Sequence, residues 1–222
     1  MQHAVIFDID GVLVDSYEPH LESWKMLAAE LGQSVTAEQF AGSFGRTSKD
    51  IIRLWWGGLL GDALTDAKIA ELDDRKEAAY REVIAKTKPV MDGAVELIDA
   101  LHAAGFKLAV GSSGPPANVA LSLKLLGREA KFSAKVTGMD VTRGKPDPQV
   151  FLIGAGKLGI DPKQCAVIED APAGIAAANA AKMASIGLLG TTDALGLKAA
   201  KLIVPTLRAL EPEGIAELIA GK

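Results

Sequence analysis

Two pairs of carboxylates each follow a short apolar run of the chain. Asp8 and Asp10 stand at the end of the first such run, and Glu169 and Asp170 stand at the end of a later one. If both runs are strands of one parallel sheet, the pairs lie at its carboxyl edge, where open α/β sheets bind ligands. Carboxylates so close together repel unless a cation or proton compensates, and Mg²⁺ takes oxygen ligands of this kind. The pairs therefore predict a Mg²⁺ site, with acidic caps of the following helices as the alternative.

The first pair also invites comparison with a calcium-binding loop. An EF-hand needs an oxygen ligand where Val12 stands, and it is not preceded by an apolar strand. This pattern disfavours the EF-hand and leaves a carboxylate site at a strand end.

Two further segments carry groups that could bind an anion. Ser112, Ser113 and Gly114 form a turn of small residues, which lets backbone amides approach an anion while hydroxyls add donors. The turn is no Walker loop, because no Gly-Lys-Ser/Thr follows, and no dinucleotide fingerprint. Lys145 precedes Pro148, the expected start of a helix, where a lysine opposes the helix dipole unless an anion lies nearby. A plain turn and a solvated lysine are the alternatives, so it is the expected meeting of all four segments that favours a catalytic site.

The elements that must position these groups follow from the hydrophobic pattern. Short apolar runs alternate with helical periodicity, and several runs are uninterrupted, which is typical of parallel strands covered on both faces. We therefore expect an α/β fold with a Rossmann-like parallel sheet and helices on both faces. The expected strands are 4–7, 107–111, 135–137, 166–168, 184–187 and 202–204, and the expected helices among them are 93–104, 117–126, 148–158 and 174–182.

The stretch between the first two strands breaks this alternation and contains only helical patterns. Thr36 and Thr65 are placed to cap helices within it. We expect a discontinuous catalytic core of residues 1–15 and 90–222, with an all-helical cap domain of residues 16–89 inserted into it.

Composition limits the class of protein. The chain has 222 residues, of which 49% are hydrophobic and 23% charged, as in ordinary globular proteins. The net charge of -4 and the lack of a dense Lys/Arg run argue against a nucleic-acid partner. Cys165, the single cysteine, lies in an apolar run and is interpreted as a buried strand thiol in a reducing compartment. With only a short apolar run near the N-terminus, we expect a cytoplasmic monomer without a membrane partner.

The four motifs, taken in order, resemble the haloacid dehalogenase superfamily in its phosphatase branch with a helical cap. The resemblance spans nearly the whole chain: Asp-x-Asp-Gly, the serine loop, Lys-Pro-x-Pro and Glu-Asp-x-x-x-Gly. It implies that Asp8 is the nucleophile and Asp10 the general acid and base. It also implies that Ser112 binds phosphoryl oxygens and that Lys145 neutralises their charge.

The same resemblance implies a metal site and excludes two reactions. Glu169 and Asp170 would hold Mg²⁺ together with Asp8 and the backbone carbonyl of Asp10. The dehalogenases and the phosphonate-cleaving branch of the superfamily lack the second aspartate of the first motif. The presence of Asp10 therefore argues against both.

Within the superfamily the sequence is similar to β-phosphoglucomutase and to sugar-phosphate phosphatases. This similarity implies a small phosphorylated substrate, bound by Ser113 and Gly114 and by cap residues. The candidate cap residues are His20, Trp24, Arg46 and Lys76. A packed histidine, a snorkelling lysine and solvated charges are the alternatives for these positions.

Two functions remain open for such an enzyme. The mutase has polar side chains soon after its serine, whereas Gly114 is followed here by Pro115 and Pro116, which cannot grip a second phosphate. The difference favours a Mg²⁺-dependent phosphatase that works through an aspartyl-phosphate, with a phosphomutase as the alternative. Response-regulator receivers also combine aspartates, Mg²⁺, a hydroxyl and a lysine, but they have no helical insert after the first strand. A binding-only relative is disfavoured because every motif residue is present.

Overall fold

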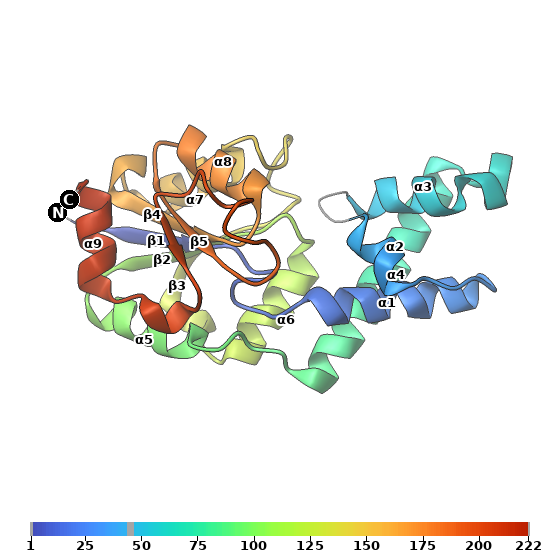
Figure 1. Ribbon diagram of the computed structural model, residues 1–222, viewed down its shortest axis with the longest axis horizontal. Coiled ribbons are helices and arrows are strands. Elements are labelled where there is room, and N and C mark those ends of the chain that lie inside the picture. Colours follow the sequence, from blue (N-terminus) through green and yellow to red (C-terminus); the bar gives the residue numbers. More distant parts are fainter. Residues whose placement is uncertain (1, 44–46, 222) are drawn as a thin grey trace. The chain divides into compact units, whose positions relative to one another are not determined.

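The computed structural model describes residues 2–43 and 47–221 and divides into two compact units (Figure 1). One unit comprises residues 1–15 and 89–222, and the other comprises residues 16–88. The chain leaves and re-enters the first unit at neighbouring points, since Asp15 N donates to Pro89 O (2.8 Å) and Val14 bridges Val90. The helical unit is therefore an insertion into the first unit.

Six parallel strands form the sheet of the first unit, in the order β3-β2-β1-β4-β5-β6. β1 pairs with both β2 and β4, so Phe7 lies beside Val110 on one side and Ile168 on the other. The order reverses at β1, and this is the switch point where α/β sheets bind ligands. The predicted Rossmann-like architecture is confirmed. The strands are β1 (Ala4–Phe7), β2 (Lys107–Gly111), β3 (Phe132–Val136), β4 (Cys165–Glu169), β5 (Ala184–Leu188) and β6 (Leu202–Val204).

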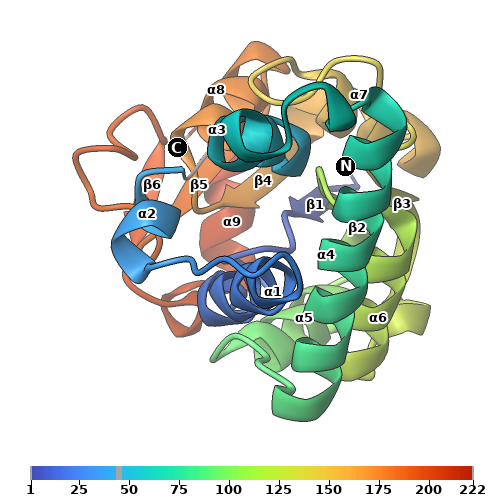
Figure 2. The ribbon, with the colours of Figure 1, turned by 90° about the vertical axis from the view of Figure 1, so that its right-hand side faces the viewer.

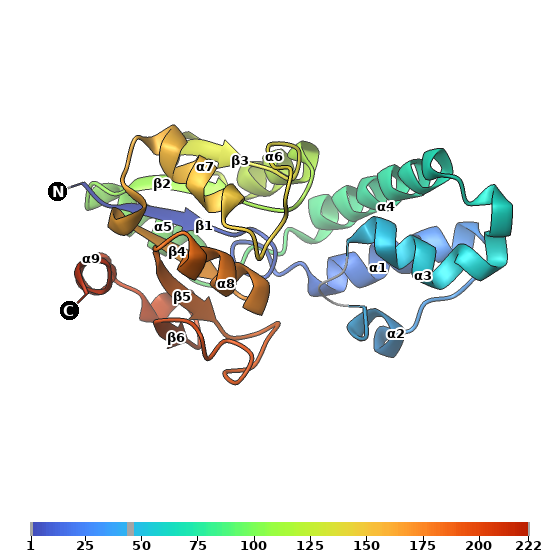
Figure 3. The same ribbon diagram turned by 90° about the horizontal axis from the view of Figure 1, so that it is seen from above.

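Helices cover both faces of this sheet (Figure 3). Successive residues of β1 point to opposite faces, so Val5 and Phe7 join one apolar cluster and Ala4 and Ile6 join the other. The first cluster includes α5 (Ala94–Ala103), α6 (Pro116–Leu126) and α9 (Pro212–Ala220), and the second includes α7 (Gln149–Leu158) and α8 (Pro172–Ala180). Single 3₁₀ turns occur at η2 (Glu129–Lys131), η3 (Pro162–Gln164) and η4 (Leu207–Ala209).

Most of the predicted elements occur within a residue or two of their expected bounds, and one differs more. β3 begins at Phe132 instead of residue 135, because this edge strand alternates buried and exposed residues, with Ser133 exposed, and so lacks a continuous apolar run. The helix α9 was not predicted. The buried thiol of Cys165 is confirmed, and burial raises its pKa to about 12.

The helical unit contains α1 (Tyr17–Glu30), α2 (Ala37–Ala41), α3 (Ser48–Leu60), the short η1 (Gly61–Ala63) and α4 (Asp66–Thr87) (Figure 2). Thr36 and Thr65 cap α2 and α4 as predicted, each accepting a backbone N–H with its hydroxyl oxygen. The unit has its own apolar core, formed by Leu21, Trp24, Leu27, Ala28, Val35, Phe40, Ile51, Ile52, Trp56, Ile69 and Leu72. In the described residues, no helix is both long and apolar enough to cross a bilayer.

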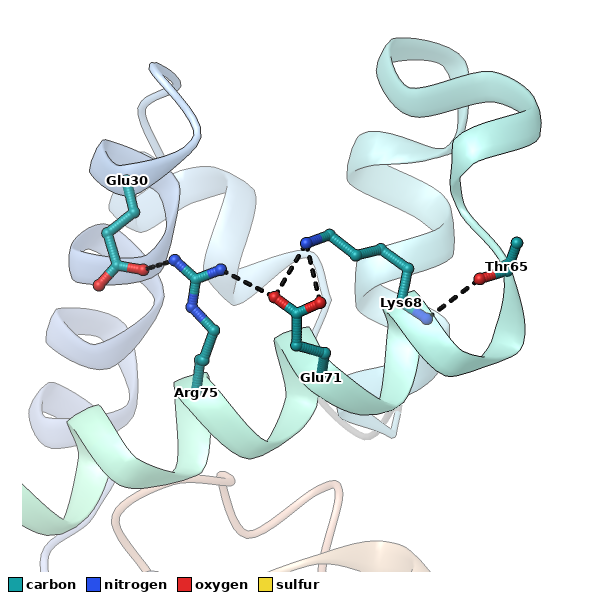
Figure 4. A network of polar contacts seen from close by, with 5 residues as sticks. All are labelled: Glu30, Thr65, Lys68, Glu71 and Arg75. Carbon is teal, nitrogen blue, oxygen red and sulfur yellow. Dashed lines mark hydrogen bonds and ion pairs between the residues drawn. The ribbon is translucent and has the colours of Figure 1, made fainter.

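A surface network joins two helices of this unit (Figure 4). Arg75 of α4 donates to Glu30 of α1 and to Glu71 of its own helix, and Lys68 also donates to Glu71. These side chains are exposed or half-exposed, so solvent screens each pair and its contribution to stability is small. The role of Arg75 here is to connect α1 with α4.

Candidate active site

A tight turn follows β1 and carries both aspartates of the first motif. Asp8 N donates to Ile168 O (3.0 Å), which continues the pairing with β4 by one residue and buries the Asp8 side chain. Gly11 then adopts a φ of 75°, which glycine reaches without strain. A Cβ at Gly11 would overlap the carboxylate of Asp170. Glycine thus lets the turn after β1 approach the end of β4.

The end of β4 presents Glu169 and Asp170, both buried. Glu169 Oε2 accepts hydrogen bonds from the backbone N–H groups of Asp170 and Ala171 (3.0 Å each). The carboxylate fills the space in front of Gly174, where a Cβ would overlap it. The first turn of α8 therefore fixes the Glu169 side chain from two sides.

Lys145 connects the two acidic pairs. Its Nζ donates to Asp8 Oδ1 and to Glu169 Oε1, each at 2.5 Å. The loop that carries it is held by Gln149 of α7, whose Oε1 accepts from the backbone N–H groups of Thr142 (2.8 Å) and Arg143 (3.0 Å). The lysine predicted to neutralise phosphoryl charge is thus bound between the predicted nucleophile, Asp8, and a predicted metal ligand, Glu169.

The Ser112 loop follows β2 at the same edge of the sheet. Ser112 N donates to Val136 O (3.0 Å), and Ser112 Oγ accepts from Gly114 N (3.0 Å). Since Oγ is the acceptor in that bond, its own proton stays available for a ligand. A Cβ at Gly114 would lie 3.9 Å from Asp10 Oδ2, so the loop approaches Asp10, while Ser113 is exposed.

Among the described residues, the charges of the cluster do not balance. Asp8, Glu169 and Asp170 bring three buried carboxyl groups against the one ammonium of Lys145. Burial raises the pKa of Asp8 well above its usual range, although Lys145 opposes the rise. Burial and the neighbouring Glu169 raise the pKa of Asp170 to about 7. Burial lowers the pKa of Lys145, but the carboxylates of Asp8 and Glu169 outweigh it and raise that pKa.

This arrangement fits a divalent cation. Carboxylate oxygens of Asp8, Glu169 and Asp170 lie within 4.8 Å of one another. Oxygen-only donors with excess negative charge suit Mg²⁺, which binds through one or two carboxylates and keeps other positions for water and phosphate. Because both oxygens of Glu169 already accept hydrogen bonds, Asp8 and Asp170 are the better direct ligands.

The contact between Gly174 and Glu169 gives a testable prediction with a matched control. Gly174 and Gly214 are each the third residue of a helix that begins with proline, but a Cβ at Gly214 would meet nothing within 4 Å. Gly174→Ala is expected to lower the free energy of unfolding by about 1–3 kcal/mol, because the new methyl displaces the Glu169 carboxylate. Gly214→Ala should instead stabilise by roughly 0.5–1 kcal/mol. Urea titrations of both variants measure this, and equal effects would refute the proposed packing.

The predicted cap residues fall into different environments. Trp24 is 1% exposed and packs against Trp55 and Trp56, so it serves the core of the helical unit. Lys76 is buried, and its Nζ contacts His20 Nδ1 and Glu77 Oε1, both at 2.8 Å. Substrate contacts by these residues stay predictions, and Arg46 lies outside the described residues.

Sequence reasoning missed two residues of the site. Gln149 was predicted only to lie in the first turn of a helix. Its position directly after Lys-Pro-Asp-Pro is the signal that could have indicated its bond to the loop that carries Lys145. Thr191, in the loop after β5, donates its hydroxyl to the Asp170 carboxylate. No motif in the sequence points to Thr191, because its position follows from the fold alone.

Fold and site define a class of protein. It is an α/β enzyme with an inserted helical domain and an acidic, lysine-bearing site at the carboxyl edge of its sheet. The chain belongs to the haloacid dehalogenase-like hydrolases, whose family model matches residues 2–182.

Named relatives include phosphatases and phosphomutases. The validoxylamine A 7'-phosphate phosphatase of Streptomyces hygroscopicus subsp. limoneus is 32% identical over 93% of this chain and 95% of its own. The β-phosphoglucomutase of Bacillus subtilis is 34% identical over 83% of this chain and 82% of its own. The crystal structure of β-phosphoglucomutase from Clostridium difficile matches with a TM-score of 0.85 and 27% identity, covering 100% of this chain and 98% of that one.

Proposed function

We propose that this enzyme is a Mg²⁺-dependent phosphatase that hydrolyses a small phosphorylated metabolite, such as a sugar phosphate, through an aspartyl-phosphate. The observation that supports this most strongly is the position of Lys145, which bonds Asp8 and Glu169 at once with Asp170 beside them. A carboxylate attacks a phosphate dianion only where positive charge screens their repulsion. A half-buried lysine beside a predicted cation site supplies that screening.

The residues then divide the reaction between them. Asp8 attacks phosphorus in line and forms the acyl phosphate, while Asp10 gives a proton to the leaving alkoxide. Asp10 next takes a proton from the water that attacks the phosphorus, which releases inorganic phosphate and restores Asp8. Ser112 donates its free hydroxyl proton to a phosphoryl oxygen, and Lys145 stabilises the charge spread over the others.

Of the four predicted ligands, Asp8, Asp170 and the Asp10 carbonyl would hold the metal directly, and Glu169 would lie beside them with both of its oxygens hydrogen-bonded. Bound there, Mg²⁺ offsets the negative charge of the nucleophile and of the phosphate it attacks.

Hydrolysis is favoured over mutase chemistry by the helix that follows the Ser112 loop. Pro115 is the N-cap of α6 and Pro116 is its first residue, so neither offers a side-chain donor or an N–H group to a second phosphate. The name of the Streptomyces relative supports a phosphatase, whereas the Bacillus relative supports the alternative of a phosphomutase. We further propose that the helical unit, which the sequence predicts at residues 16–89, caps the site and that the enzyme works as a cytoplasmic monomer.

The test is phosphate release from a panel of aldose, ketose and polyol phosphates. We expect release from at least one compound with Mg²⁺, none with EDTA, and recovery when Mg²⁺ is restored.

The mutase alternative is tested with β-glucose 1-phosphate and a catalytic amount of the 1,6-bisphosphate. Accumulation of glucose 6-phosphate without free phosphate would overturn the proposal of a phosphatase.

A further inference from the structure

The turn that follows β3 is organised around one carboxylate. Asp140 Oδ2 accepts from the backbone N–H and from the hydroxyl of Thr137, both at 2.8 Å. Its Oδ1 accepts from Lys157 of α7 (3.1 Å), which also donates to the Lys135 carbonyl (2.8 Å). These bonds lower the pKa of Asp140, the Thr137 N–H most of all, so the group is ionised at neutral pH. The turn is thereby tied both to the end of its own strand and to a covering helix.

This turn touches the Ser112 loop directly. Gly138 N donates to Gly114 O (2.9 Å), and a Cβ at Gly138 would overlap the Ser113 carbonyl oxygen. Both backbone groups of Gly114 are therefore hydrogen-bonded. Its N–H group donates to Ser112 Oγ (3.0 Å), and its carbonyl oxygen accepts from Gly138 N. Gly138 thus contacts the same glycine whose N–H group is bonded to the Ser112 hydroxyl oxygen.

We propose that Asp140 is a positioning residue for phosphate binding: by closing the turn at 137–140 it places Gly138 N against Gly114 O and so orients the Ser112 hydroxyl. The proposal rests on the proposed function, because it takes the Ser112 loop as the phosphate site. Asp140 itself touches no reacting group. Its effect is transmitted through Thr137 and Gly138, by the contacts given above.

The consequences differ from those of general destabilisation. Ser112 binds phosphoryl oxygens in the substrate, the transition state and the product alike, so its displacement weakens all of these complexes together. A loss of uniform binding raises KM and leaves kcat nearly unchanged. Inorganic phosphate, as the product, must lose affinity in parallel.

The experiment compares four variants of the full-length enzyme with inorganic phosphate as the probe, in the presence of Mg²⁺. Asp140→Ala removes every bond of the carboxylate, whereas Asp140→Asn keeps an oxygen that accepts from Thr137. Gly138→Ala pushes the two loops apart by a different route. Asp161→Ala is the matched control, since Asp161 also accepts a backbone N–H in a turn (2.9 Å, from Lys163) but lies before β4, at the other edge of the sheet.

Calorimetry then gives the Kd for phosphate. Steady-state assays give the KM and kcat for the compound that the panel identifies as a substrate. We expect Asp140→Ala and Gly138→Ala to raise both Kd and KM by about 10- to 100-fold, since small displacements in such sites have effects of this size. Asp140→Asn and Asp161→Ala should stay near the wild type. A wild-type Kd for Asp140→Ala, or an equal rise for Asp161→Ala, would overturn the proposal. If the wild-type enzyme binds phosphate but hydrolyses nothing in the panel, the proposed function fails, and the Kd series still decides the role of Asp140.

Discussion

Asp8→Asn is expected to abolish phosphate release, with kcat reduced by about 10⁴-fold or more, the effect seen when a covalent nucleophile is removed. The amide has nearly the shape of the carboxylate but no negative oxygen with which to attack phosphorus. Asp8 is buried between the ends of β1 and β4, and its N–H group is bound to Ile168 O whatever the side chain. The variant should therefore fold, and the loss should appear in kcat in steady-state assays with saturating substrate and Mg²⁺.

The control for this variant is Asp74→Asn. Asp74 lies on α4 and is exposed, so the same chemical change there should leave kcat unaltered. Ordinary rates from Asp8→Asn would contradict the covalent mechanism.

Lys145→Met is expected to produce the second large effect, and it acts on activity and stability together. Without the ammonium, activity should fall by about 10²- to 10³-fold, as when one preorganised charge-stabilising donor is removed. The three buried carboxyl groups then lose the cation that the described residues place beside them, so the free energy of unfolding in EDTA should fall by about 3 kcal/mol. Thermal or urea denaturation of the metal-free protein measures this loss.

Magnesium separates this account from simple loss of packing. A cation bound by Asp8 and Asp170 takes over part of the charge that Lys145 balanced, so added Mg²⁺ should recover much of the lost stability of the variant. Lys163→Met is the control, because Lys163 is exposed in η3 at the opposite edge of the sheet. The free energy of unfolding of this variant should match the wild type and should gain no more from Mg²⁺ than the wild type does. A stability loss for Lys145→Met that Mg²⁺ leaves untouched would contradict the account.

The main lines of the site could be predicted from sequence because parallel strands impose them. β1 and β4 are uninterrupted apolar runs that neighbour each other, so residues directly after Phe7 and Ile168 must share an edge. The Ser112 loop follows β2 on the other side of β1 by the same rule. Lys145 was harder to place, because it follows an irregular loop, and its motif rather than its strand suggested its role.

What the sequence did not disclose depends on bonds between distant side chains and backbone groups. The sequence does not show that the Glu169 carboxylate accepts hydrogen bonds from Lys145 and two backbone N–H groups. Nor does it show that Arg75 forms an ion pair with Glu30 of another helix. Asp140 reads as an ordinary turn residue until its bonds to Thr137 are seen. Trp24 was a candidate substrate-binding residue by similarity, yet its side chain lies in the apolar core of the helical unit.

One measurement addresses the covalent step itself. The enzyme, mixed with Mg²⁺ and its substrate and quenched in acid within the first turnover, is reduced with borohydride, which converts an aspartyl-phosphate to homoserine. Peptide mass spectrometry should find homoserine at position 8, with Asp10, Glu169 and Asp170 unchanged, and none when EDTA replaces Mg²⁺. Intact Asp8 under turnover, or modification at another carboxylate, would contradict the assignment of the nucleophile.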